Sequence, residues 1–213
     1  MPQPLIKICG LSTAETLGAA IAAQADYAGL VFHPASPRHV SPGMAAQLGA
    51  QAAGQIVRVG LFVDASDGDI GDAVAAAGLD ALQLHGSESP ARAAELRARF
   101  GIPVWKAIAV AARADLDRAV RYVGAADLVL LDAKTPTGAL PGGMGLSFDW
   151  ALLDGWKAPL AWGLAGGLTP ANVAQAAAAT RAPLIDTSSG VETAPGSKDP
   201  ALIALFCRTV SNA

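Results

Sequence analysis

The chain has 213 residues, of which 52% are hydrophobic and 15% charged, and its formal net charge is −3. It shows no basic stripe, which argues against binding to nucleic acid, and no run of the roughly 18 apolar residues that would span a membrane. Only Cys9 and Cys207 are present, so a disulfide framework is not expected. Because no secretion signal is recognisable, we expect a cytoplasmic protein with one domain over residues 1–213.

Apolar, β-prone runs alternate with alanine-rich stretches of helical period along the whole sequence. The expected strands are 5–8, 27–32, 56–63, 81–84, 104–108, 128–132, 160–165 and 184–187. The expected helices are 14–25, 42–53, 67–77, 90–100, 115–123, 148–153, 170–180 and 200–211. Four helix starts place a capping residue before a proline, namely Ser41, Ser89, Thr169 and Asp199.

Eight strand–helix units without a break in composition predict an α/β protein, a single (β/α)8 TIM barrel. An open doubly wound sheet is the alternative. The one long connection, residues 133–147, is rich in glycine and proline. Connections of that length are usually functional or disordered.

In such a barrel the chemistry lies at the carboxyl ends of the strands. There the sequence places Cys9, His85, Asp132 and Asp186. Each also has a purely structural interpretation: Cys9 as a small buried hydrophobe, His85 as a satisfied buried histidine, and Asp186 as a support for loop backbone. Asp132 is harder to dismiss, because an acid that ends a row of lumen-facing leucines needs a partner or a raised pKa. We interpret Asp64, at another strand end, as a helix start.

The loops after the seventh and eighth strands predict a phosphate site. Gly166 and Gly167 come before an expected helix start, and Ser188, Ser189 and Gly190 add hydroxyl and backbone N–H groups. These two loops commonly hold phosphate in this fold. The residues alone therefore predict a barrel enzyme that acts on a small phosphorylated metabolite.

The sequence also resembles the phosphoribosylanthranilate isomerase family, the barrel of tryptophan biosynthesis, nearly from end to end. The motifs that carry the resemblance include KICGL at 7–11, SPRHV at 36–40, VGLFV at 59–63, LQLHG at 82–86, LAGGLTPANV at 164–173 and DTSSGVE at 186–192. Gly145 to Trp150 and Leu131-Asp132 add further matches.

The resemblance implies an Amadori rearrangement of N-(5-phosphoribosyl)anthranilate, without a metal or organic cofactor. Its motifs match Cys9 to the general base, Asp132 to the general acid, and Arg38 to the group that holds the anthranilate carboxylate. The phosphate is expected on the backbone of Gly166, Gly167, Ser189 and Gly190. We include His85, Asp186 and Ser188 among the substrate-binding residues.

A thiol with an ordinary pKa is mostly protonated at neutral pH. To act as a base, Cys9 therefore needs a nearby cation that favours its thiolate form. Lys7 is our candidate, because it shares a strand face with Cys9. Asp132 has the opposite need: burial or a neighbouring negative charge must help it hold its proton. If these assignments are right, replacing Lys7 will change the pH dependence of turnover.

One position departs from the family pattern. The family usually has threonine or serine where this sequence has Met144, between two glycines. We predict that Met144→Thr does not lower activity.

Two other functions stay open at this stage. One is a histidine-pathway isomerase. That group resembles the chain less, because it has an aspartate at the position that Cys9 occupies here. The other is a silent barrel that binds a phosphorylated ligand but has no use for Cys9 and Asp132 together. We expect a monomer.

Overall fold

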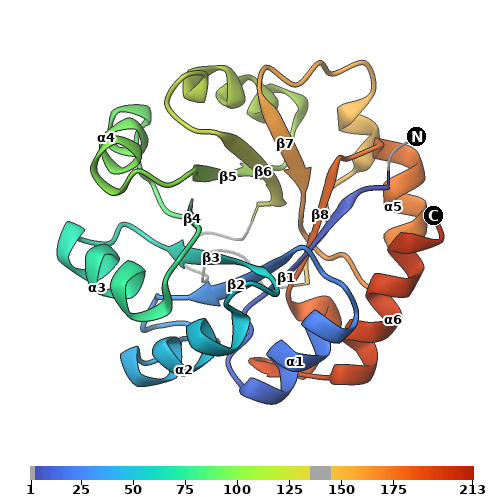
Figure 1. The fold of residues 1–213 in the computed structure, drawn as a ribbon. Coiled ribbons are helices and arrows are strands. Elements are labelled where there is room, and N and C mark those ends of the chain that lie inside the picture. The colour runs from blue at the N-terminus through green and yellow to red at the C-terminus, as the bar shows by residue number, and fades with distance from the viewer. Residues whose placement is uncertain (1–2, 135–144) are drawn as a thin grey trace.

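The computed structural model describes residues 3–134 and 145–213. Eight parallel strands close into a barrel in the order in which they occur along the chain, and the last strand pairs with the first. Figure 1 shows the helices as an outer ring around these strands. The strands are β1 (Leu5–Cys9), β2 (Tyr27–Val31), β3 (Val57–Phe62), β4 (Ala81–Leu84), β5 (Val104–Val110), β6 (Leu128–Ala133), β7 (Ala161–Leu164) and β8 (Leu184–Thr187). The TIM-barrel prediction is confirmed, and the open doubly wound sheet is wrong.

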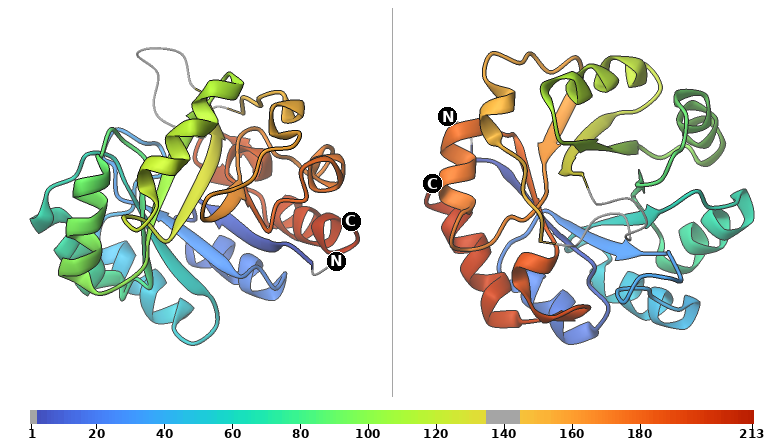
Figure 2. Two further views of the ribbon diagram at one scale, coloured as in Figure 1. Left: turned by 90° about the horizontal axis from the view of Figure 1, so that it is seen from above. Right: turned by 180° about the vertical axis from the view of Figure 1, so that it is seen from behind.

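Six α-helices lie among the described residues: α1 (Ala14–Ala22), α2 (Pro42–Ala52), α3 (Asp67–Ala77), α4 (Pro90–Phe100), α5 (Val173–Thr180) and α6 (Pro200–Ser211). Three of the four predicted caps are confirmed, since Ser41, Ser89 and Asp199 each accept a hydrogen bond from the first turn of their helix. The chain ends meet on one side of the barrel, where Gln3 Nε2 donates to Ser211 O at 2.7 Å. Both views of Figure 2 show this proximity.

The predicted helix start at Thr169 is wrong by one turn. α5 begins at Val173, because Asn172 turns its side chain back to accept from Thr169 N and to donate to Gly167 O. These bonds stabilise a separate turn between the Gly166-Gly167 pair and the helix. The glycine pair is therefore followed by a braced turn rather than directly by a helix terminus.

Three other expectations need correction. Residues 115–123 form part of a 3-10 helix, η1 (Arg113–Tyr122), and residues 148–153 contain only the short 3-10 helix η2 (Trp150–Leu153). In η1 the Asp115 carboxylate accepts from two preceding backbone N–H groups, whereas Asp149 caps η2 by accepting from the following Ala151 N. Asp64 does not start α3, because Ser66 is its cap; instead Asp64 has a positive φ and accepts from Ser87.

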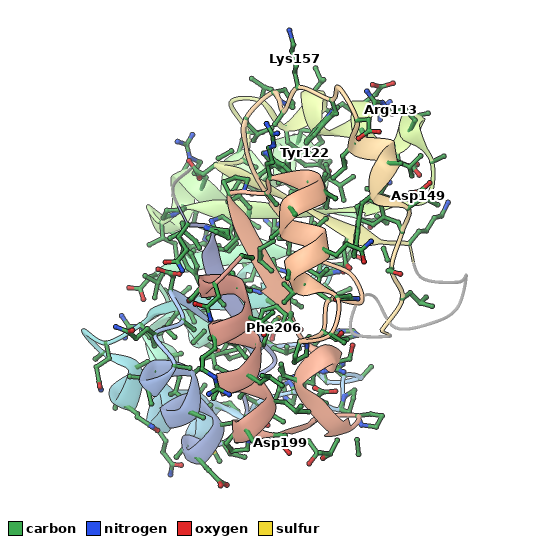
Figure 3. The ribbon with its side chains drawn as sticks, turned by 90° about the vertical axis from the view of Figure 1, so that its right-hand side faces the viewer. Arg113, Tyr122, Asp149, Lys157, Asp199 and Phe206 are labelled. Carbon is green, nitrogen blue, oxygen red and sulfur yellow. The ribbon has the colours of Figure 1, made fainter. Side chains whose placement is uncertain are left out.

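After β8 the chain forms an element that the sequence did not predict. The 3-10 turn η3 (Ser189–Val191) leads into a small antiparallel hairpin of β9 (Glu192–Ala194) and β10 (Ser197–Lys198). The dipeptide Pro195-Gly196 makes its turn, with Gly196 at φ 83°. Asp199 then caps α6, and Figure 3 shows this residue at the opposite end of the molecule from the projecting Lys157.

The core has two layers that follow from the alternation of side chains along each strand. Outward-facing residues such as Ile6 and Ile8 pack against the helices, where Phe206 of α6 is also buried. Inside the barrel a smaller apolar cluster contains Val59, Trp105, Leu130 and Leu184. This cluster fills the lower lumen, so the polar residues that follow it on the strands lie above a packed floor.

Within residues 3–134 and 145–213, the helices are all too short or too polar to cross a membrane. In the same residues, His, Cys, Asp and Glu side chains do not gather in any group of three or more that could hold a metal ion. Met144 lies outside the described residues, so its predicted effect stays a prediction.

Candidate active site

All ten predicted site residues line one pocket at the carboxyl ends of the strands. They are Cys9, Arg38, His85, Asp132, Gly166, Gly167, Asp186, Ser188, Ser189 and Gly190. They come from different strands and loops, and closure of the barrel brings them together. The pocket also contains residues that were not predicted from the sequence, among them Gln83.

Cys9 is the last residue of β1, and only 5% of it is exposed. Its neighbour across the sheet is Gly29 of β2, where an added Cβ would lie 3.0 Å from the Cys9 sulfur. The absence of a side chain at Gly29 therefore makes room for the thiol. One layer below, Lys7 is fully buried and donates to Asp186 at 2.9 Å.

The electrostatics of Cys9 refine the role expected for Lys7. Burial raises the pKa of the Cys9 thiol above its ordinary value, and the Asp186 carboxylate acts in the same direction. Lys7 and Lys198 both act to lower this pKa, but burial outweighs them. Lys7 thus acts on the thiol in the expected sense, although it does not make the thiolate the favoured form at neutral pH.

Asp186 supports more than loop backbone, because its carboxylate is the partner of Lys7. Burial alone would lower the pKa of Lys7, but attraction to Asp186 and to Cys9 keeps it above its ordinary value. Burial also raises the pKa of Asp186, against the attraction of Lys7. A buried ion pair of this kind fixes both side chains, since removal of either would leave an unpaired charge.

The β9–β10 hairpin adds a second charged cluster beside Cys9. Arg38 donates through Nε and Nη2 to the two carboxylate oxygens of Glu192, each at 2.7 Å. Lys198 contacts the same carboxylate and donates to Ser188 Oγ at 3.3 Å. The two cations hold the pKa of Glu192 below its ordinary value despite burial, and burial lowers the pKa of Lys198.

The roles of Glu192 and Lys198 were not predicted from the sequence. The turn dipeptide Pro195-Gly196 signals a hairpin, but nothing in the sequence shows that the hairpin folds back onto β1. This contact is close: an added Cβ at Gly10, directly after Cys9, would lie 3.2 Å from Lys198 Nζ.

Asp132 lies on β6 and is buried to all but 8% of its surface. Its Oδ1 accepts from Ala133 N at 2.8 Å, and its Oδ2 lies 3.2 Å from His85 Nε2. Gly166, at φ 90°, makes space for this carboxylate, because an added Cβ would lie 3.0 Å from Asp132 Oδ1. His85 is therefore a neighbour of the predicted acid as well as a pocket residue.

The loops after β7 and β8 pack directly on each other. Thr187 Oγ1 donates to Leu168 O at 2.7 Å, and an added Cβ at Gly190 would lie only 1.8 Å from the same oxygen. Among the described residues, the backbone N–H groups of Gly166 and Gly167 make no hydrogen bond. These loops therefore present backbone donors to the pocket, which is the arrangement that a phosphate requires.

The chain is similar to known proteins over nearly its whole length. Residues 6–209 match the family described as N-(5'phosphoribosyl)anthranilate (PRA) isomerase. The N-(5'-phosphoribosyl)anthranilate isomerase of Rhodopseudomonas palustris strain HaA2 is 54% identical over 205 residues, which cover 96% of this chain and 94% of that protein.

Solved structures agree with this match. The phosphoribosyl anthranilate isomerase of Thermotoga maritima has a TM-score of 0.88 at 34% identity, covering 99% of this chain and 100% of that chain. A phosphoribosyl anthranilate isomerase in complex with reduced 1-(o-carboxyphenylamino)-1-deoxyribulose 5-phosphate has a TM-score of 0.86 at 32% identity, with the same coverage. Together these matches decide against the histidine-pathway family and the silent barrel: the chain belongs to the N-(5'-phosphoribosyl)anthranilate isomerase family, the TIM-barrel isomerases of tryptophan biosynthesis.

Proposed function

We propose that the chain converts N-(5-phospho-β-D-ribosyl)anthranilate to 1-(2-carboxyphenylamino)-1-deoxy-D-ribulose 5-phosphate, with Asp132 as general acid and Cys9 as general base. The observation that carries this proposal is a thiol and a carboxylate at the ends of β1 and β6, in one pocket with two phosphate-type loops. A structural relative bound to the reduced form of that product supports it. The rearrangement oxidises C2′ and reduces C1′ within one molecule, so it needs no external oxidant or reductant.

In the first step Asp132 gives its proton to the ring oxygen of the ribose. The bond from C1′ to that oxygen breaks, and the nitrogen lone pair forms a C=N bond, which leaves a positive charge on the nitrogen. Asp132 suits this role because its Oδ2 lies 3.2 Å from His85 Nε2 and its Oδ1 accepts from Ala133 N, so the carboxyl group is fixed in place. A fixed donor contributes more to such a step than a mobile one.

In the second step Cys9 removes the proton from C2′. The released electron pair forms a C1′=C2′ double bond and neutralises the nitrogen, and the resulting enolamine tautomerises to the ketose. The order matters for Cys9, because its pKa lies above the ordinary value. The positive nitrogen formed in the first step favours the thiolate and makes the C2′ proton more acidic at the same time.

Binding residues surround these two groups. Arg38, held by Glu192, is positioned to bind the anthranilate carboxylate through its guanidinium group. We assign the phosphate to the backbone of Gly166, Gly167, Ser189 and Gly190, with Ser188 beside it. His85 and Asp186 line the same pocket, and we assign both to substrate binding.

The test is the decay of anthranilate fluorescence when purified protein meets freshly made phosphoribosylanthranilate. We expect rapid decay with the wild type and decay that is slower by roughly 10²- to 10⁴-fold with Cys9→Ala. Cys207→Ala serves as the matched control, because Cys207 is a buried core residue of α6 whose pKa burial raises to about 11. Full activity in Cys9→Ala would remove Cys9 from the mechanism.

We further propose that one chain is the working unit, in the cytoplasm, without nucleic-acid or membrane partners. Every group that the mechanism uses lies within this chain. Light scattering during size-exclusion chromatography, combined with the activity of each peak, tests this: a dimer that loses activity on dilution would contradict it.

A further inference from the structure

Gln83 is a pocket residue that the proposed mechanism does not use. It lies on β4 inside the barrel and is fully buried. Its Nε2 lies 3.1 Å from His85 Nδ1, and His85 Nε2 lies 3.2 Å from Asp132 Oδ2. Gln83, His85 and Asp132 therefore form a continuous chain of polar contacts that runs from the lumen to the proposed acid.

One atom in this chain is unsatisfied. Gln83 Oε1 is buried and has no hydrogen-bond partner among the described residues. A buried carbonyl oxygen without a donor is unfavourable, and such exceptions require an explanation. The two ends of a glutamine amide have nearly the same shape, so a half turn would place Oε1 beside His85 Nδ1.

The two amide orientations correspond to two proton counts. When Nε2 of Gln83 donates to Nδ1 of His85, the neutral ring carries its proton on Nε2 and donates it to an ionised Asp132. In that state the pair has no proton to give to a substrate.

The second state contains one proton more. That proton sits either on Asp132, pointing at Nε2 of His85, or on the imidazole ring, facing an Asp132 carboxylate. Both arrangements need a hydrogen on Nδ1 of His85, and this hydrogen needs an acceptor. Only the turned amide, with Oε1 toward the ring, supplies it from Gln83.

We propose that Gln83 is a positioning residue whose amide orientation follows the proton held by the His85–Asp132 pair, so that the pair as a unit stores the proton that Asp132 delivers. The inference rests on the proposed function, because it assumes that Asp132 is the acid. The proposal explains the unpartnered Oε1: this oxygen accepts the hydrogen on Nδ1 of His85 when the His85–Asp132 pair holds the additional proton.

Other charged groups surround the pair and act on it. Asp186 of β8 interacts electrostatically with both His85 and Asp132, and Cys9, His33 and Arg38 line the same pocket. Behind the backbone of β4, Lys106 donates to Leu84 O and Gly86 O and pairs with Glu88 at 2.8 Å. These groups are unchanged in the Gln83 variants below, so a difference between the variants reports on the amide itself.

The first test is a pH titration of the imidazole nitrogens by 15N NMR. The chain has three histidines, so His33→Asn and His39→Asn assign the His85 signals by elimination. In the wild type we expect the neutral His85 ring to carry its proton on Nε2. A ring that is still protonated on Nδ1 after the pair has lost its additional proton at high pH overturns the proposal without any variant of Gln83.

Two Gln83 variants separate the orientations. Gln83→Glu accepts from Nδ1–H and cannot donate, so the His85 titration moves to higher pH by about one unit or more. Gln83→Met fills a similar volume without hydrogen bonds, so the titration moves to lower pH. Identical His85 titrations in the wild type and in both variants contradict the proposal.

Kinetics give the second readout. In Gln83→Met we expect kcat to fall roughly 10- to 100-fold, the effect of losing a hydrogen bond to a charged group, with little change in KM. Gln47→Met, the same change on the exposed face of α2, controls for the substitution itself.

If Asp132→Asn keeps full turnover, the proposed acid is wrong, whereas the His85 titration still decides the role of Gln83. If Asp132→Asn is inactive and the titration does not move, only the Gln83 inference fails.

Discussion

The two sides of the pocket control protons by different physical means. The acid side, which we define as Gln83, His85 and Asp132, is a chain of polar contacts with lengths of 3.1 and 3.2 Å. Its members contact one another through groups that can each change their hydrogen-bonding role, and two of them, His85 and Asp132, can gain or lose a proton. The side chains on the other side of the pocket are mostly permanently charged, and they surround a single thiol.

The base side consists of Cys9 with the ion pair of Lys7 and Asp186 and with the hairpin cluster of Arg38, Glu192 and Lys198. Within the ion pair the two charges cancel, whereas the cluster contains two cations and one anion. Lys7 has the largest cationic effect on the pKa of Cys9, Asp186 opposes it, and Lys198 of the hairpin adds a smaller effect in the same direction as Lys7.

This difference follows from the task of each group. A general acid has to gain and lose its proton in every turnover, which favours partners that can change their own hydrogen-bonding state. A buried thiol base has to overcome the cost of becoming an anion, which favours a fixed positive charge nearby. The predictions below test whether hydrogen bonds control one side and charge controls the other.

The largest effect is expected from removal of either reacting group. Cys9→Ala and Asp132→Asn should each lower kcat by roughly 10²- to 10⁴-fold, the usual contribution of a general acid or base. The double variant should lose much less than the product of the two, because both groups serve one reaction. Single-turnover fluorescence decay measures all three. Multiplicative losses would mean that the two groups act independently.

The next effect concerns the charge on the base side. Lys198→Met removes a cation that lowers the pKa of Cys9, so this pKa should rise further. A base works deprotonated, and the rising limb of kcat/KM against pH should therefore move to higher pH. At neutral pH we expect a loss of about tenfold, which corresponds to a shift of about one pH unit.

Lys157→Met is the matched control for this change, because Lys157 is exposed and projects away from the barrel (Figure 3). Its pH profile should coincide with that of the wild type. A Lys198→Met profile that also coincides with the wild type would show that the hairpin does not set the proton affinity of the thiol.

Much of this arrangement could be predicted from the sequence, because it depends on local patterns. The alternation of β-prone and helical segments gave the barrel, and the barrel placed Cys9, His85 and Asp132 at one end. The glycines of the β7 and β8 loops were recognisable because close backbone contacts exclude side chains there.

The rest depends on contacts between residues far apart in the chain. The partner of Lys7 is Asp186, 179 positions away, and that of Arg38 is Glu192, 154 positions away. Local sequence shows that these residues are charged but not which charges meet. The helix start at Thr169 failed for a related reason, since the Asn172 side chain competes for the same backbone groups.

The smallest effect is expected from Ser188→Ala, and it sharpens the comparison most. This change removes a hydrogen bond on the base side, the 3.3 Å contact from Lys198, while leaving every charge in place. If charge controls this side, the pH profile of kcat/KM should not move, and only KM should rise a few-fold through weaker phosphate binding. A shift as large as that of Lys198→Met would mean that the hydroxyl positions the ammonium group. In that case hydrogen bonds would control both sides of the pocket, and the contrast between them would disappear.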